Sequence, residues 1–429
     1  PDEAFITRGP MKLFLLALAL PFATAGLYTG HEVIRVSTES REEQAKLLDL
    51  VNDEGLDLWS TFEHHIDVRG VGLTQKLRSW GFGNSSVLHE DAQTVLDHTL
   101  NEWVCKSDKC ATDDFYKAYQ MLDTIESRTN SFIRANPNFV SKLTGFGVST
   151  EGREIFGYVL TAARKQNKNK MKAFYNCGIH AREWLPVPFC LWLGETLVRE
   201  YEAGVDSAIQ ILDNIEIHVV PIVNPDGYVY SRTVDNMWRK SRKPNPGSAC
   251  VGTDLNRNLP RKWGSGGSST DPCSNTYMGA SPLDNPETAA LYEYVVALRP
   301  TVYMDIHASG LMWLAPEGHR PRSACPSDPR GCGVDDDAAF KAYMASGEAS
   351  RVAIKAVHGN NFRVGPITYI IYQASGSTVD TMFHVAGAKY SYSPEVRAGF
   401  QPNPINIVPS NEELQEGVRA QLLYALAHP

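Results

Sequence analysis

The sequence predicts an α/β fold, in which a large domain with a mixed β-sheet covered by helices on both faces follows a small α+β domain. In the large domain, apolar runs of strand length occupy residues 171–177, 215–223 and 301–306. Between these runs, residues 188–201 and 286–298 have patterns typical of helices. Strands that alternate with helices imply a sheet covered on both faces, and the ligands of such sheets gather at the carboxyl ends of the strands.

The small domain is predicted from the acidic stretch that precedes the large domain. Polar and apolar side chains alternate over residues 31–36, which predicts a strand, and residues 41–51 have a helical pattern. The polar segment 105–110 contains two lysines and suits a linker. We therefore expect a small domain with its linker at residues 26–109 and a large domain at residues 110–429.

The beginning of the chain is set apart from both domains. Residues 1–10 precede the first methionine and are not interpreted. Residues 11–25, MKLFLLALALPFATA, contain a lysine, an apolar run and two small residues at the spacing of a cleavage site, which is the arrangement of a secretory signal peptide. A buried N-terminal helix is the alternative interpretation. We expect a secreted, extracellular protein.

Charge and hydropathy argue against two classes of partner. The chain has 41 Lys and Arg residues against 49 Asp and Glu residues, a net charge of −8, and no long basic run, so a nucleic-acid partner is not expected. Nothing after the leader has the ~20 consecutive apolar residues that a membrane span needs. A membrane partner is therefore not expected either.

The eight cysteines are an even number, which fits an oxidising compartment. They fall into four pairs of near neighbours along the chain, but spacing alone leaves the connectivity open. The four pairs are Cys105 and Cys110, Cys177 and Cys190, Cys250 and Cys273, and Cys325 and Cys332.

The stretch GIHAREWLP places His180 and Glu183 three positions apart, just after the end of the first expected strand. His307 stands just past the end of the third expected strand, so that all three side chains are expected at one edge of the sheet. Two histidines and one glutamate are a suitable ligand set for a catalytic zinc ion, which takes three protein ligands and a water molecule. Because His-x-x-Glu alone is a weak signal in a chain with 12 histidines, the rest of the sequence has to support it.

Five further motifs occur along the large domain: NPDG at residues 224–227, WRK at 238–240, CVGTDLNRN at 250–258, IYQASG at 371–376 and YSPEVR at 392–397. From about residue 116 to its C-terminus, the chain resembles the zinc metallocarboxypeptidases of the pancreatic carboxypeptidase A/B type, in which these motifs come in the same order. The separation between Glu183 and His307 also matches the layout of that family. The small domain resembles the family's propeptide.

The resemblance implies one zinc ion per chain, bound by His180, Glu183 and His307. Glu395 matches the family's catalytic carboxylate, which takes a proton from water and later delivers it to the leaving amine. Arg239 matches the arginine that polarises the scissile carbonyl and stabilises the developing oxyanion.

The resemblance also implies residues that bind the substrate. Asn256 and Arg257 match the pair that grips the terminal carboxylate of the substrate, for which the planar fork of arginine is well suited. Tyr372 matches the mobile tyrosine that closes over the bound C-terminus, and Arg182 matches an arginine of a further subsite. Asp254 matches the carboxylate that orients a ligand histidine, here the first of the two.

The pocket for the substrate's last side chain is expected to be apolar. Val379 matches the residue at the base of this pocket, where enzymes that prefer C-terminal Lys or Arg have an aspartate. Ile367 and Ala374 match further positions of the pocket. A basic side chain would be buried there without a counter-charge, which is unfavourable. Asp380 matches an aspartate that both specificity types share, so we expect a preference for aliphatic or aromatic C-terminal residues.

Two stretches depart from the family pattern. After the third zinc ligand, the pancreatic enzymes usually have Ser-Tyr, whereas this chain has Ala308 and Ser309. The missing tyrosine ring affects the shape of the next substrate subsite but not the chemistry. Residues 319–336 contain two cysteines and are expected to form a long, disulfide-closed loop at the rim of the site.

The resemblance places the activating cleavage near Lys106 and Lys109, where a trypsin-like protease can cut. Both lysines lie between Cys105 and Cys110. If these two cysteines pair, the cut propeptide remains tethered by sulfur; the alternative is that both are bonded elsewhere or free. Two other pairs resemble bridges of the family: Cys177 with Cys190, and Cys250 with Cys273.

The sequence thus predicts a secreted, monomeric zinc carboxypeptidase zymogen that acts on peptide or protein C-termini. An esterase or amidase with the same chemistry is a first alternative, but Asn256, Arg257 and Tyr372 serve a free terminal carboxylate. A catalytically inactive binding protein is a second alternative. Such a protein is expected to have lost a zinc ligand or Glu395, and this chain retains them all.

Overall fold

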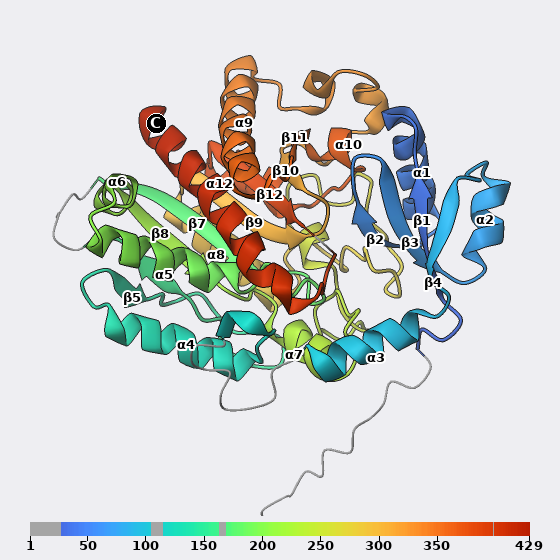
Figure 1. Cartoon of the computed structure of the whole chain (residues 1–429), viewed down its shortest axis with the longest axis horizontal. Helices are drawn as coiled ribbons and strands as arrows, with labels where there is room; N and C mark the ends of the chain where they lie inside the picture. The colour runs from blue at the N-terminus through green and yellow to red at the C-terminus, as the bar shows by residue number, and fades with distance from the viewer. Residues whose placement is uncertain (1–26, 104–114, 163–168, 398) are drawn as a thin grey trace, which may run out of the picture.

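The computed structural model describes residues 27–103, 115–162, 169–397 and 399–429 (Figure 1). Within these residues, no helix is long and apolar enough to cross a membrane. The expected signal peptide and the linker with Cys105 and Cys110 lie outside the described residues.

A mixed sheet of eight strands forms the centre of the large domain, as the sequence predicts. In spatial order its strands are β11 (Arg363–Pro366), β10 (Met312–Ala315), β12 (Tyr390–Val396), β9 (Val302–Ala308), β7 (Met171–Cys177), β8 (Ile215–Val220), β6 (Tyr158–Leu160) and β5 (Val140–Lys142). The four middle strands β12, β9, β7 and β8 are parallel. By contrast, β10 runs antiparallel to β12, and β6 runs antiparallel to β8.

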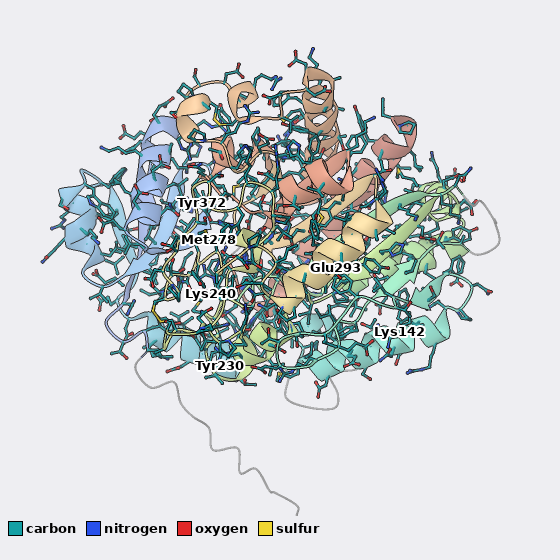
Figure 2. All side chains as sticks on the ribbon, turned by 180° about the vertical axis from the view of Figure 1, so that it is seen from behind. Lys142, Tyr230, Lys240, Met278, Glu293 and Tyr372 are labelled. Carbon is teal, nitrogen blue, oxygen red and sulfur yellow. A yellow bond between two sulfur atoms is a disulfide. The ribbon has the colours of Figure 1, made fainter. Side chains whose placement is uncertain are left out.

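Helices cover both faces of this sheet (Figure 1). One face is covered by α4 (Leu122–Ala135), α5 (Phe189–Glu202), α6 (Asp206–Asn214), α9 (Asp337–His358) and α12 (Ile407–Ala427). The other face is covered by α8 (Pro286–Leu298), which lies in front of the sheet in Figure 2. Successive side chains of a strand point to opposite faces, so that Met304 of β9 joins the core of the first face and Tyr303 that of the second.

The small domain has an antiparallel sheet of four strands, with the order β2 (Asp57–Thr61), β3 (His65–Gly70), β1 (Glu32–Ser37) and β4 (Ser85–His89). Its core includes Leu47 of α1 (Arg41–Asp53) and Leu77 of α2 (Leu73–Ser79). A third helix, α3 (Ala92–Glu102), follows the sheet. The edge strand β2 lies on the side of this domain that faces the large domain (Figure 1).

The expected strands and helices are present, with two differences at their ends. The run expected to reach residue 223 ends as β8 at Val220, because the next residue, Pro221, has no N–H to donate to a neighbouring strand. The expectation that His307 stands just past a strand is wrong. His307 lies within β9, because Glu395 of the neighbouring strand β12 pairs with it and extends the ladder.

Three of the expected cysteine pairs are disulfide-bonded. The bridges are Cys177–Cys190, Cys250–Cys273 and Cys325–Cys332. The first joins the end of β7 to α5, and the last closes a turn within the loop expected at residues 319–336.

Candidate active site

The segment that carries His180 and Glu183 begins where β7 ends. Gly178 has a φ of 63°, a left-handed conformation that glycine adopts without strain. A Cβ atom at this position would also lie 3.3 Å from the Cα atom of Ile222. The chain therefore turns sharply at Gly178, and the backbone N–H of Ala181 donates to the carbonyl of Arg239 at 3.1 Å.

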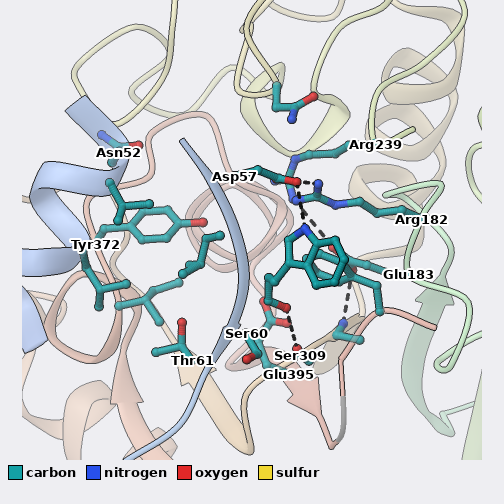
Figure 3. A pocket seen from close by; sticks show the side chains of 18 of the residues that line it. Asn52, Asp57, Ser60, Thr61, Arg182, Glu183, Arg239, Ser309, Tyr372 and Glu395 are labelled. Carbon is teal, nitrogen blue, oxygen red and sulfur yellow. Dashed lines mark hydrogen bonds and ion pairs between the residues drawn. The ribbon is translucent and has the colours of Figure 1, made fainter. Parts of the chain in front are cut away.

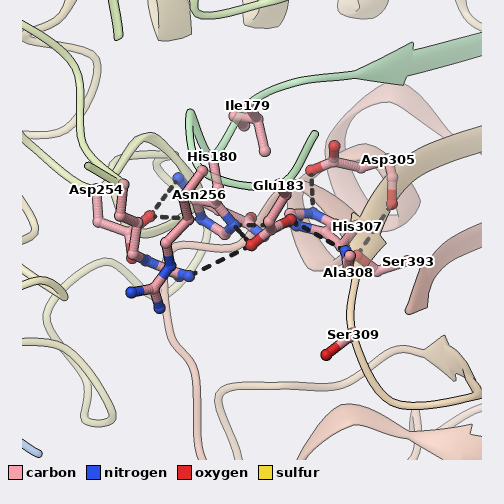
Figure 4. A network of polar contacts seen from close by, with 12 residues as sticks. Ile179, His180, Glu183, Asp254, Asn256, Asp305, His307, Ala308, Ser309 and Ser393 are labelled. Atoms are coloured by element: carbon pink, nitrogen blue, oxygen red, sulfur yellow. Dashed lines mark hydrogen bonds and ion pairs between the residues drawn. The ribbon is translucent and has the colours of Figure 1, made fainter. Parts of the chain in front are cut away.

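This turn brings His180 and Glu183 against His307 of β9 (Figure 4). The Nδ1 atom of His180 lies 2.8 Å from Oε1 of Glu183, and Nδ1 of His307 lies 3.0 Å from Oε2 of the same carboxylate. The two Nδ1 atoms are 3.0 Å apart. All three side chains are buried, and their candidate ligand atoms lie within 4.8 Å of one another. The arrangement can hold a metal ion.

Carboxylates hold the opposite nitrogen of each histidine ring. Nε2 of His180 lies 3.0 Å from Asp254, the residue that the resemblance proposes as its partner, and Nε2 of His307 lies 2.9 Å from Asp305. A partner at Nε2 sets the tautomer that leaves Nδ1 free to bind a metal, so these residues fit a zinc ion. Asp305 was missed in the sequence. The signal that could have found it is its spacing of two from His307 at the end of the predicted strand, because side chains two apart on a strand share one face.

Glu395 lies beside this cluster because β12 and β9 pair in register at Glu395 and His307. Its side chain is partly buried at the wall of a cavity, and desolvation raises its pKa to about 8. His307 and Arg239 act to lower this pKa, whereas Glu183 and Asp305 act to raise it. A carboxyl group with a pKa near neutrality is suited to proton transfer.

Arg239 lies on the other side of the metal-ligand cluster. Its Nε and Nη2 atoms donate to Oδ2 of Asp254 at 3.1 and 2.9 Å, and its Nη1 atom lies 3.6 Å from Glu183. Arg239, Glu183, Glu395 and Tyr372 line one cavity (Figure 3). The guanidinium group is therefore oriented by a carboxylate at one edge of the cavity that also contains the expected general base.

Of the expected carboxylate-binding pair, Asn256 lies close to His307. Nδ2 of Asn256 lies 3.4 Å from Nε2 of His307, and its Oδ1 accepts the backbone N–H of Thr378 at 2.8 Å. Arg257 is buried, and it donates to the carbonyls of Asn256 at 2.8 Å and Gly267 at 3.1 Å. Neither residue lines the cavity that contains Glu395.

The expected specificity residues form one apolar cluster. Val379, Ile367 and Ala374 are buried together, and Tyr372 packs at the edge of this cluster. Asp380 is directed elsewhere: it accepts the backbone N–H groups of Gly318 at 3.0 Å and of the following residue at 3.2 Å. Its negatively charged carboxylate thus accepts hydrogen bonds from the backbone at the start of the 319–336 loop.

The small domain reaches into the site through β2. Asp57 accepts from Nη1 of Arg182 at 2.6 Å and from Nη2 of Arg69 at 2.9 Å (Figure 3). The hydroxyl of Ser309 donates to the carbonyl of Trp59 at 3.2 Å. With β2 in place, a cavity of about 90 Å³ remains. No sequence signal singled out Asp57, because its partner Arg182 lies far away along the chain.

The comparison with known proteins agrees with this geometry. A sequence profile described as zinc carboxypeptidase matches residues 125–417. Carboxypeptidase A2 of Rattus norvegicus is 29% identical over 436 residues, which cover 98% of this chain and 99% of the relative. Carboxypeptidase B of Rattus norvegicus is 30% identical over 400 residues, which cover 90% and 91%. The crystal structure of the carboxypeptidase A from Helicoverpa armigera superposes with a TM-score of 0.79 at 26% identity, covering 94% and 99% of the two chains. The chain therefore belongs to the zinc carboxypeptidase family.

Proposed function

We propose that this protein is a secreted zymogen of a zinc carboxypeptidase that removes single aliphatic or aromatic residues from the C-termini of peptides or proteins. The observation that carries the proposal is the convergence of His180, Glu183 and His307 on one point beside Glu395. Two histidines and one glutamate are a common ligand set of catalytic zinc in peptidases. We propose one zinc ion per chain at these ligands.

When bound, zinc supplies Lewis-acid activation of the attacking water and of the scissile carbonyl. Glu395 takes the proton of that water and delivers it to the leaving amine, for which its position beside His307 at the cavity wall is suitable. Arg239 donates to the developing oxyanion from the edge of the same cavity. Asp254 and Asp305 hold the ligand histidines in the orientation that this chemistry needs.

Arg257 and Asn256 are proposed to bind the terminal carboxylate of the substrate. Arg257 is buried with backbone carbonyls as its partners, so that its charge is available to an incoming carboxylate. Tyr372 closes over the bound C-terminus. A free terminal carboxylate is therefore required, which distinguishes a carboxypeptidase from an esterase or amidase that accepts neutral acyl groups.

The apolar cluster of Val379, Ile367 and Ala374 supports the proposed preference for aliphatic and aromatic residues. Asp380 is adjacent in sequence, but its carboxylate is occupied by backbone N–H groups. A C-terminal lysine or arginine would be buried without a counter-charge in this pocket.

The small domain is proposed to act as a propeptide at residues 26–109, and residues 110–429 as the catalytic domain. The support is that β2 lies across the site and that Asp57 pairs with Arg182, a residue expected to contact substrate. A trypsin-like protease that cuts the linker would release this block. The active form is proposed to be a monomer.

Metal analysis combined with peptide hydrolysis tests this function. We expect one zinc ion per chain. After limited trypsin treatment, we expect hydrolysis of a peptide that ends in free phenylalanine, and no hydrolysis of the same peptide with an amidated C-terminus. Equal hydrolysis of the two peptides would point to an amidase or endopeptidase. No hydrolysis of either peptide by the zinc-loaded, trypsin-treated protein would point to a binding protein.

A further inference from the structure

A second cavity, of about 630 Å³, lies between helix α1 of the small domain and the loop closed by Cys325–Cys332. Residues of α1 form one wall, and Arg322 belongs to the loop on the other. The cavity is also lined by Arg363 at the start of β11 and by Tyr369 of α10 (Ile367–Ile370). The proposed reaction uses none of these residues.

Arg363 is a partly buried charged residue of this cavity. Its Nη1 atom donates to Oε1 of Gln44 at 3.0 Å, and its Nη2 atom lies 3.2 Å from the sulfur of Met312. In the described part of the chain it forms no ion pair with a carboxylate, and burial lowers its pKa to about 10. The charge of Glu63 opposes this lowering but does not outweigh it. A partly buried guanidinium group that forms no ion pair is unfavourable, and a bound anion would offset this.

Two more arginines face the same space. Arg41 donates from Nη1 to the hydroxyl of Tyr369 at 2.6 Å, and no carboxylate of the described residues pairs with it. Arg322 has an Nε atom that is buried and lacks a hydrogen-bond partner among these residues. The carboxylate nearest to it, that of Asp49, lies 3.6 Å away, beyond hydrogen-bond distance. Burial and the charge of Arg41 lower the pKa of Arg322, although Asp49 opposes this.

Charged residues of both signs line the cavity. The basic residues are Arg41, Lys46, Arg322 and Arg363, and the acidic residues are Glu42, Asp49 and Asp53. Within the described residues, Asp49 is the one carboxylate of this group that forms an ion pair with an arginine of the cavity, and its geometry is poor. Positive charge is thus in excess around Arg363, in a protein whose net charge is −8.

We propose that this cavity binds a tetrahedral oxyanion, a sulfate or phosphate group, held by Arg41, Arg322 and Arg363. The planar guanidinium fork donates two parallel hydrogen bonds to such an oxyanion, and three guanidinium groups can share its oxygens. Arg41 belongs to the small domain and the other two arginines to the large domain. An anion that binds all three stabilises the docked arrangement, because it binds this arrangement better than the separated domains.

Titration of the full chain with sodium sulfate and sodium phosphate, at an ionic strength matched with sodium chloride, tests the proposal. We expect saturable binding by calorimetry and at least fivefold slower hydrogen exchange of the α1 amides when the anion is bound. We expect Arg41→Met and Arg322→Met each to weaken binding at least tenfold. Arg330→Met is the matched control, because Arg330 lies in the same loop but pairs with Asp337 at 2.6 Å.

Absence of saturable binding of both anions, or equal affinities in the Arg41→Met, Arg322→Met and wild-type chains, would overturn the proposal. Arg41 is exposed, so its replacement tests the site even if Arg363→Met fails to fold. A sulfated disaccharide that binds tenfold more tightly than inorganic sulfate identifies a sulfated sugar as the source of the group. Equal affinity of the disaccharide and of inorganic sulfate identifies the free anion as the ligand. Both readouts are independent of peptide hydrolysis, so failure of the proposed function is detected separately.

Discussion

Replacing Asp57 with asparagine is expected to loosen the contact between the small domain and the active site. Asp57 is buried between Arg182 of the large domain and Arg69 of its own domain, with contacts of 2.6 and 2.9 Å. Asparagine has nearly the same shape but no charge, so the substitution leaves Arg182 without its counter-charge. Because the small domain covers the site, the uncut chain should then show more activity.

The magnitude follows from the charges around Asp57. Burial acts to raise the pKa of Asp57, but Arg182 and Arg69 outweigh it and lower the pKa from 3.8 to about 2. At 1.36 kcal/mol per pKa unit, this corresponds to ~2.4 kcal/mol of stabilisation by the ionised carboxylate, or roughly a 60-fold change in an equilibrium constant. Arg69 remains with Asp57 when the domains separate. Only the part of this stabilisation that comes from Arg182 therefore holds the domains together. The full stabilisation is present above pH 3.8 and is lost as the pH falls toward about 2, where Asp57 becomes protonated.

The assay is hydrolysis of a short peptide with a free C-terminal phenylalanine, measured before and after trypsin treatment. We expect the uncut Asp57→Asn chain to be several-fold and at most roughly 60-fold more active than the uncut wild type. Activity after trypsin should be equal. Glu54→Gln is the control, because Glu54 forms a surface ion pair with Lys76 at 2.6 Å within the small domain. The reasoning is refuted if uncut Asp57→Asn is as inactive as the wild type but reaches full activity after trypsin.

Four further outcomes are expected. Glu395→Gln should keep one zinc ion per chain while losing nearly all turnover, and a near-normal kcat would contradict its role as the base. Val379→Asp should move the preference toward C-terminal arginine and lysine; higher kcat/KM of the wild type on arginine than on phenylalanine or leucine would show that the pocket is misassigned. Asp305→Asn should weaken zinc binding by ~10–100-fold in a competition with a chelator, and unchanged affinity would make Asp305 a purely structural residue. If Cys105 and Cys110 pair, the fragments after limited trypsin treatment should separate on electrophoresis with reductant and migrate as one band without it; separation without reductant means that there is no tether.

Local patterns predicted much of the fold. The apolar run at residues 171–177 is β7, because a short apolar run is typical of a strand buried on both faces. The helical pattern at residues 286–298 is α8. The proximity of His180 and Glu183 could also be predicted from the sequence, since both lie on one short segment. The small strands β10 and β11 were not predicted, because each has only four residues and depends on neighbouring strands for its hydrogen bonds.

The sequence by itself determined the chemistry of this protein: which side chains can bind a metal, transfer a proton or accept an apolar residue. The tertiary structure alone decided some of the contacts between distant elements. Glu395 faces His307 because two strands distant in the sequence pair in register, and Asp57 reaches Arg182 because the edge strand of one domain lies against the other. Such contacts depend on long-range packing of whole elements, and no local pattern of residues specifies them.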